Sequence, residues 1–75
     1  SSSSFSSHLY DECISISKDG LLKFPDSFGL FNNLCICHTA KGEYDLAEKA
    51  CLHGLQIAPQ NETINQNYQE VLQQK

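Results

Sequence analysis

Five residues in the middle of the chain have side chains that bind metal ions or act as nucleophiles: Cys35, Cys37, His38, Cys51 and His53. Zinc in proteins favours Cys and His ligands. On an α-helix, residues two positions apart point about 200° away from each other, so we do not expect Cys35 and Cys37 to share one tetrahedral ion. No Cys-x-x-Cys pair is present. The pattern therefore favours packing in a core over metal binding.

A cysteine near a histidine is also the pair used in Cys–His nucleophilic catalysis. The sequence indicates no third residue that would orient the histidine. The connections between the expected helices are too short to form a pocket with convergent polar groups, which catalytic sites normally need. We therefore expect the chain itself to be no enzyme and to hold no cofactor and no metal. Whether a catalytic domain is attached in a longer parent protein is left open.

Helices are the elements that must position these residues. Apolar residues spaced by three and four predict four helices, over about residues 9–24, 28–41, 44–58 and 62–74. Pro25 cannot continue a helix and should end the first one. Gly42 is expected to end the second helix in a left-handed conformation, and Asn61 should cap the start of the fourth. Asn61 also begins the sequence Asn61-Glu62-Thr63, which fits a glycosylation sequon.

Length and composition limit the classes of function. A chain of 75 residues holds one domain. Its net charge is −4, and its five Lys and Arg residues are scattered, so no basic patch for nucleic acid is expected. The longest apolar run is far too short to cross a membrane. Residues 1–7 are nearly all serine and should not order themselves, so they are expected to be a linker remnant or a non-native segment.

The same residue types return after 34 residues. Tyr10 is followed by Tyr44, Gly20-Leu21 by Gly54-Leu55, and Pro25 by Pro59. Glycine inside a helix costs about 1 kcal/mol relative to alanine, so the recurrence of Gly20 at Gly54 predicts close helix contact as the compensation. Residues 31–59 show a distinctive order of large, small and turn residues: Phe31, Leu34, Cys35, His38, Gly42, Tyr44, Ala47, Cys51, Gly54, Leu55 and Pro59. This order and the 34-residue interval resemble the tetratricopeptide repeat, whose unit is two antiparallel helices.

The resemblance implies an all-α fold in which antiparallel helical hairpins stack as a right-handed superhelix. Residues 8–75 would form this segment, with one full repeat at about 28–61 and a half repeat on each side. About three repeats are normally needed for independent stability, so we expect a piece of a longer array. All four cysteines, including Cys13, would occupy packed positions where the family has small or apolar residues. We therefore expect reduced thiols and an intracellular, cytoplasmic protein, in which the sequon at Asn61 would be silent.

The family's concave surface implies a binding site for a protein or peptide. Asn33 and Asn67 would occupy equivalent positions on successive first helices and face this groove. An Asn side chain offers both an acceptor and donors, so it can pair with a peptide backbone. The alternative, a solvated or locally bonded asparagine, stays open. The implied partner-binding residues are Asn32, Asn33, Ile36, Thr39, Thr63, Gln66, Asn67 and Glu70, with Ala40 and Gln73 on the same side.

The expected function is a protein–protein interaction scaffold that binds an extended peptide or a partner helix in the groove, without nucleic acid or membrane partners. One alternative is a substrate-presenting region of a larger enzyme, such as a glycosyltransferase or methyltransferase. Another is a structural assembly or self-association module. The first helix lacks a hairpin partner, so Leu9 and Ile16 are expected to lie on an uncovered apolar face that another copy could bind.

Overall fold

The computed structural model describes the backbone of residues 4–75 and the side chains of residues 9–75. This part of the chain is all-helical and contains no strand, which confirms the predicted fold class at this level. The four helices are α1 (Ser4–Lys23), α2 (Phe28–Lys41), α3 (Tyr44–Ile57) and α4 (Glu62–Gln74). No helix among residues 4–75 has the length and apolar character needed to cross a membrane.

The serine-rich segment is the place where observed and predicted helices differ most. Residues 1–3 of the predicted linker 1–7 lie outside the described residues, whereas residues 4–7 belong to α1, which begins at Ser4. The physical reason is helix cooperativity. Once a helix has formed, each added residue gains a backbone hydrogen bond without a new nucleation cost, and serine is only moderately unfavourable in a helix.

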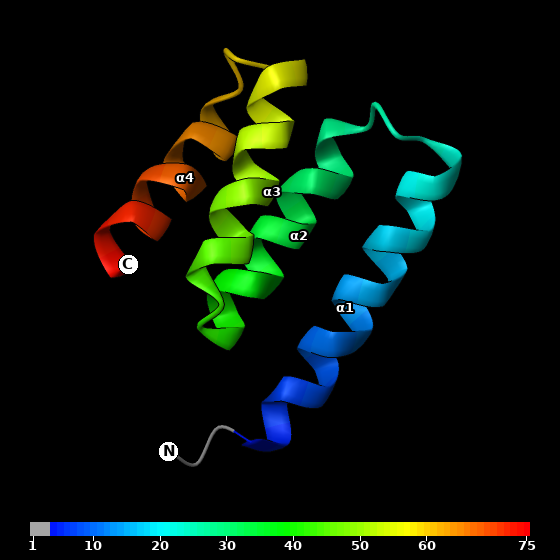
Figure 1. Ribbon diagram of the computed structural model, residues 1–75, viewed down its shortest axis with the longest axis vertical. Helices are drawn as coiled ribbons and strands as arrows, with labels where there is room; N and C mark the ends of the chain where they lie inside the picture. The colour runs from blue at the N-terminus through cyan, green and yellow to red at the C-terminus, as the bar shows by residue number, and fades with distance from the viewer. Residues whose placement is uncertain (1–3) are drawn as a thin grey trace.

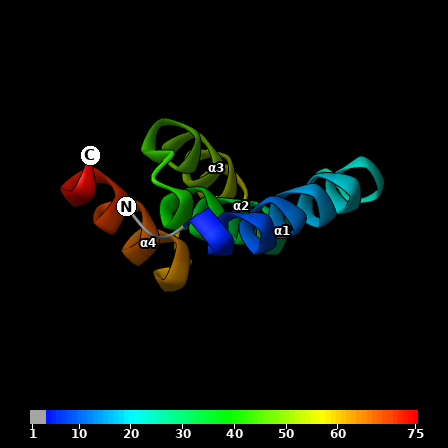
Figure 2. The ribbon, with the colours of Figure 1, turned by 90° about the horizontal axis from the view of Figure 1, so that it is seen from below.

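Helix α2 is the central element of the fold. It contacts each of the other three helices, whereas α1 contacts only α2 within the described residues. Figure 1 shows α1 and α4 on opposite sides of the molecule, with α2 and α3 between them. Seen from below in Figure 2, α1, α2 and α4 form one row and α3 lies above α2. The face of α2 that is turned away from α3 is therefore free of a covering helix.

The two connections that join α1 to α2 and α3 to α4 have the same hydrogen-bond pattern. The amide of Phe24 donates to the carbonyl oxygen of Gly20, with N and O 2.8 Å apart. Thirty-four residues later, Ala58 donates to Gly54 at the same distance of 2.8 Å. The following helices also start at equivalent positions, Phe28 and Glu62. The 34-residue repeat of the sequence is thus a repeat of the backbone.

Close helix packing repeats with the same interval. A Cβ atom placed on Gly20 would lie 2.8 Å from Cδ1 of Leu30, and one placed on Gly54 would lie 3.0 Å from Cδ1 of Ile64. Leu30 and Ile64 are again 34 residues apart. Both glycines therefore allow the side chain of the next helix to approach the backbone, which confirms the close contact predicted from their recurrence.

Ion pairs at the helix ends follow the repeat as well. Lys41, at the end of α2, bonds to Asp11 on α1. Lys75, directly after α4, lies 3.5 Å from the equivalent Asp45 on α3. The hydrogen bond to Asp11 raises the pKa of Lys41, and the hydrogen bond to Glu48, with the nearby Asp45, raises the pKa of Lys75. The pairs are exposed, so each is expected to contribute little to stability.

The core is a thin layer along α2. Its buried apolar residues are Ile14, Leu34, Cys35, Cys37, Ala47, Ala50, Cys51, Ile64 and Val71.

Gly42 ends α2 with φ 84°, the predicted left-handed conformation. The side chain of Asn61 accepts a hydrogen bond from the amide of Ile64 at 3.0 Å and so caps α4, also as predicted. These two residues set where α2 ends and where α4 begins.

Candidate functional site

A cleft of about 180 Å³ lies between α2 and α4. Its lining contains four of the predicted partner-binding residues and the neighbouring Ala40: Ile36, Thr39, Ala40, Asn67 and Glu70. Three of these residues come from α2 and two from α4. The structure thus brings residues from the two equivalent helices of the 34-residue repeat to one surface.

Helical geometry explains why Ile36 reaches this cleft. It follows the buried Leu34 by two positions, which turns its side chain about 200° away from the core. Leu34 is only 6% exposed, whereas Ile36 is 46% exposed. A large aliphatic side chain is therefore presented to solvent at the edge of a polar cleft, where a partner could cover it.

The two predicted groove asparagines have different surroundings. The side-chain amide of Asn67 donates to the side-chain oxygen of Asn32, with N and O 2.6 Å apart. Both residues are half-buried, while Asn33 is exposed. Asn67 and Asn32 thus link α4 to α2, which the sequence analysis did not anticipate. The remaining oxygen and amide hydrogen of Asn67 stay available at the cleft.

The hydroxyl of Thr39 already forms a hydrogen bond within its own helix. Its hydroxyl donates to the carbonyl oxygen of Cys35 at 2.7 Å, four residues earlier. The hydroxyl oxygen can still accept a bond from a ligand. Glu70 is exposed, and no salt bridge to it is found among the described side chains. The cleft therefore offers hydrogen-bond acceptors and one negative charge beside an apolar patch.

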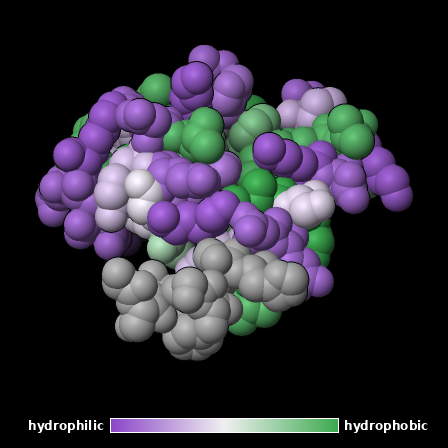
Figure 3. Space-filling view, turned by 60° about the horizontal axis from the view of Figure 1, so that its bottom comes forward, coloured by the Kyte–Doolittle hydropathy of each residue, from purple (hydrophilic) through white to green (hydrophobic). Residues whose placement is uncertain are grey.

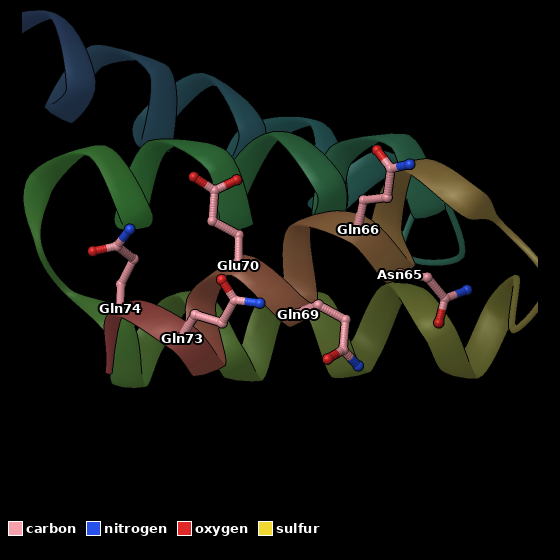
Figure 4. A pocket seen from close by; sticks show the side chains of 6 residues that line it. All are labelled: Asn65, Gln66, Gln69, Glu70, Gln73 and Gln74. Atoms are coloured by element: carbon pink, nitrogen blue, oxygen red, sulfur yellow. The ribbon is translucent and has the colours of Figure 1, made fainter.

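Four of the eight predicted binding residues do not line this cleft: Asn32, Asn33, Thr63 and Gln66. Thr63 is exposed near the start of α4. Gln66 borders a second hollow of about 500 Å³, whose lining comes from α4 alone: Asn65, Gln66, Gln69, Glu70, Gln73 and Gln74. Figure 4 shows these six side chains projecting from the one helix, without a facing wall. Because all of its lining residues come from one helix, this hollow has no opposite wall that could enclose a ligand.

A third hollow, of about 470 Å³, was not predicted from the sequence. It lies at the connection between α1 and α2 and is lined by Lys23, Phe24, Pro25, Asp26 and Ser27. Phe24 is 65% exposed, and the nearby Leu22 is also exposed. Figure 3 shows hydrophobic patches in the middle and at the right of one face, among hydrophilic side chains. The large apolar residues directly before Pro25 are the sequence feature that could have indicated this hollow.

The prediction of reduced cysteines is wrong. Cys13 on α1 is bonded to Cys37 on α2, and Cys35 on α2 is bonded to Cys51 on α3. The Cα atoms are 6.5 and 5.5 Å apart in the two pairs, within the usual range. Cys35 and Cys37 point about 200° apart on α2, and this angle explains why they form bonds with cysteines of two different helices. It directs one sulfur towards α1 and the other towards α3.

The disulfides also change the chemistry that these cysteines can perform. A thiolate is the species that attacks an electrophile or binds zinc, and a disulfide sulfur carries no such charge. No group of three or more His, Cys, Asp or Glu side chains in the described part of the chain is arranged to hold a metal ion. The two bonds instead connect α2 covalently to the helices on both sides.

The two histidines of the central segment have structural contacts. His38 is buried, and its Nδ1 lies 2.9 Å from Oε1 of Glu43. This hydrogen bond is the main reason that the pKa of Glu43 is lowered, and the nearby Lys41 adds to the effect. His53 stacks on Phe31, with ring centroids 5.1 Å apart. Both contacts hold the α2–α3 hairpin together and lie apart from the α2–α4 cleft.

Comparisons with known protein-family models, curated proteins and solved structures find no match to this chain.

Proposed function

We propose that this chain is a protein-interaction module of the tetratricopeptide type, which binds an extended peptide in the cleft between α2 and α4. The observation that carries the proposal is the cleft itself. Four residues expected to face a partner, Ile36, Thr39, Asn67 and Glu70, line it together. The 34-residue repeat of loops, glycine contacts and ion pairs supports the assignment to this class of repeat protein.

The cleft's chemistry suggests which peptide it would take. Ile36 and Ala40 supply an apolar surface, and Asn67 and Thr39 supply hydrogen-bond acceptors. The carboxylate of Glu70 favours a cation, since charge-assisted hydrogen bonds are stronger than neutral ones. The preferred ligand is therefore an extended segment with a Lys or Arg next to a small apolar residue. The net charge of −4 favours the approach of such a basic segment.

A peptide array probed with the oxidised, folded chain tests this proposal. Peptides with a Lys or Arg beside an apolar residue should bind, and matched peptides with Glu should not. Ile36→Ser should weaken binding by about tenfold, equivalent to about 1.4 kcal/mol. Glu70→Gln should remove the preference for basic residues and lower the salt dependence of the affinity. Failure of every array peptide to bind the folded chain would contradict the proposal.

A matched control separates the cleft from general electrostatics. Glu12→Gln changes the charge by the same amount as Glu70→Gln, at an exposed position on α1. If both variants weakened binding equally, the net charge rather than the cleft would be the cause. A loss confined to Glu70→Gln would place the cationic residue of the peptide at α4.

The disulfides favour a different compartment from the one predicted. Two bonds join cysteines that lie on three different helices. Such bonds form and persist in oxidising environments and are rare in the cytosol. We therefore assign the module to an oxidising compartment, such as the secretory pathway or the extracellular space. Its peptide partners would be found there.

Self-association is a second candidate function, and a specific observation favours it. Ile16 on α1 is 64% exposed, whereas its equivalent on α3, Ala50, is 6% exposed. Leu9 on the same helix is exposed as well. The occupant of this face would be the α1 helix of a second copy, which carries the same apolar residues. The substrate-presenting role in a larger enzyme stays a prediction.

A further inference from the structure

We propose that Asn61 carries an N-linked glycan. Asn61 is the only asparagine of the sequence that is followed by a non-proline residue and then Ser or Thr, in Asn61-Glu62-Thr63. The inference rests on the oxidising compartment assigned above. It does not depend on the peptide-binding proposal.

The cellular compartment determines whether this sequon can be glycosylated. In the cytosol an Asn-x-Thr sequence is chemically silent, because the glycosylating enzyme acts in the secretory pathway. The bonds Cys13–Cys37 and Cys35–Cys51 give the chain the covalent structure of a protein that folds in an oxidising environment. The endoplasmic reticulum forms disulfides and also glycosylates sequons. The two observations therefore point to the same place.

The local geometry leaves the reacting nitrogen of Asn61 free. The side-chain oxygen accepts the capping bond from the amide of Ile64, at 3.0 Å. No hydrogen bond from Nδ2 is found among the described residues, and none of their side-chain nitrogen or oxygen atoms is both buried and unpaired. The Nδ2 atom of Asn61 therefore reaches solvent. One atom of the side chain caps the helix while the other stays available for the sugar.

The rest of the sequon is also accessible. Glu62 and Thr63 are exposed, and Asn61 is half-exposed. Asn61 has an extended backbone, with φ −73° and ψ 115°, in the short connection after Pro59. Glycosylated asparagines lie on the surface in loops of secreted proteins. The position meets this requirement without any displacement of a helix.

The chemical step is a group transfer that needs a lipid-linked oligosaccharide donor and an oligosaccharyltransferase. The bond between the first sugar's C1 and the donor's pyrophosphate oxygen breaks, and a bond between C1 and Nδ2 of Asn61 forms. The nitrogen loses one proton, and the lipid pyrophosphate leaves with the bonding electron pair. No atom is oxidised or reduced. The product keeps the amide oxygen, so the N-cap of α4 is retained.

The glycan would sit away from the proposed peptide cleft. Asn67 lies six positions further along α4, which corresponds to about 9 Å along the helix axis. Figure 1 shows the α3–α4 connection at the end of α4 opposite to the C-terminus. A sugar attached there starts at the end of α4 that begins the helix, several turns before the C-terminus. Glycosylation and peptide binding can therefore be measured separately.

Expression of the full chain behind a cleavable secretory leader in cultured human cells tests the proposal. We expect one glycosylated species whose gel shift disappears after treatment with peptide N-glycosidase, and peptide mass spectrometry should place the modification on Asn61. Thr63→Ala should abolish the shift, and Thr63→Ser should keep it. Gln56→Glu, an amide-to-acid change at an exposed position on α3 outside the sequon, should have no effect on it. Cell lysate and medium are both analysed, because the glycan is attached before secretion.

Asn61→Asp provides the control for folding. Aspartate keeps a side-chain oxygen that can cap α4, but it lacks the acceptor nitrogen. This variant should lose the glycan while its bacterially produced form melts at the wild-type temperature. The proposal is overturned if the chain enters the secretory pathway and forms both disulfides but Asn61 remains unmodified. It is also overturned if the glycan shift persists in Thr63→Ala.

Discussion

The side-chain amide of Asn67 on α4 donates a hydrogen bond to the side-chain oxygen of Asn32 on α2, with N and O 2.6 Å apart. This bond connects the two helices that line the proposed peptide cleft. Asn67 therefore stabilises the cleft in addition to lining it. Asn33, which occupies the equivalent position on α2, is exposed. The two asparagines are equivalent in sequence but differ in burial and in hydrogen bonding.

The two asparagines should respond differently to truncation. Asn67→Ala removes the bond and leaves the half-buried Asn32 without this donor, so it should lower the free energy of unfolding by about 1 kcal/mol. Asn33→Ala, at an exposed position, should change it by less than about 0.5 kcal/mol. Urea unfolding of both variants measures the difference. Equal stability of the two variants would show that the bond contributes nothing.

Removal of the two disulfides should have distinct effects. Replacing Cys35 and Cys51 by Ala takes away a fully buried bond in the core and should cost about 2–4 kcal/mol. Replacing Cys13 and Cys37 by Ala should mainly release α1, because α1 contacts only α2 in the described structure. Hydrogen exchange should therefore increase in α1 more than in α3. Uniform exchange in both double variants would contradict this division.

The two equivalent glycines should tolerate alanine to different degrees. At Gly20 the added Cβ would meet the end of the Leu30 side chain, which is only partly buried and can move. The gain of about 1 kcal/mol in helix propensity should then offset the contact. At Gly54 the Cβ would meet Ile64, which is fully buried, and Phe31. Gly54→Ala should cost about 1–3 kcal/mol, measured by thermal unfolding beside Gly20→Ala.

Stability should fall in acid partly because of Glu43. Its hydrogen bond with His38 and the nearby Lys41 lower its pKa in the folded chain below the ordinary value of 4.5. A lowered folded pKa stabilises the fold above pH 4.5, and this contribution is lost as the pH falls through the folded pKa. Glu43→Gln should flatten the pH dependence of the melting temperature in this acid range. Asp26→Asn, an exposed carboxylate change in the α1–α2 connection, is the matched control.

Self-association through α1 can be tested at defined concentrations. Analytical ultracentrifugation of the oxidised chain should show a monomer–dimer equilibrium, driven by burial of Leu9 and Ile16. The double variant Leu9→Ser, Ile16→Ser should stay monomeric with little loss of stability, because both side chains are exposed. Leu52→Ser, at an exposed apolar position on α3, should leave the dimer intact. A wild-type chain that is monomeric at all concentrations would exclude this function.

Local sequence was sufficient to predict the four helices and most of their ends, with the start of α1 as the exception. Pro25 prevents α1 from continuing, Gly42 adopts the left-handed conformation that ends α2, and Asn61 caps α4. Each of these effects depends on backbone conformation within a few residues. The 34-residue recurrence of Gly20 and Gly54 likewise predicted close helix contact, because a missing Cβ has value only where another helix approaches.

The family resemblance also implied that Ile36 would lie on the concave surface, and the structure exposes its side chain while Leu34 is buried. The sequence could not identify which atoms would meet across helices. Asn67 could have paired with water, a peptide or another helix, and only the position of α4 beside α2 placed Asn32 within 2.6 Å. Contacts of this kind depend on the relative position of two helices, which no local pattern specifies.

The cysteines show most clearly which features local sequence determines and which depend on tertiary structure. Helical periodicity alone determined that Cys35 and Cys37 project in different directions from α2. Tertiary structure then placed Cys51 opposite one of them and Cys13 opposite the other. A thiol on a packed helix face is equally compatible with a reduced core and with a disulfide. The distance to a second sulfur distinguishes the two, and that distance is set by helix packing between residues 16 and 24 positions apart in the chain.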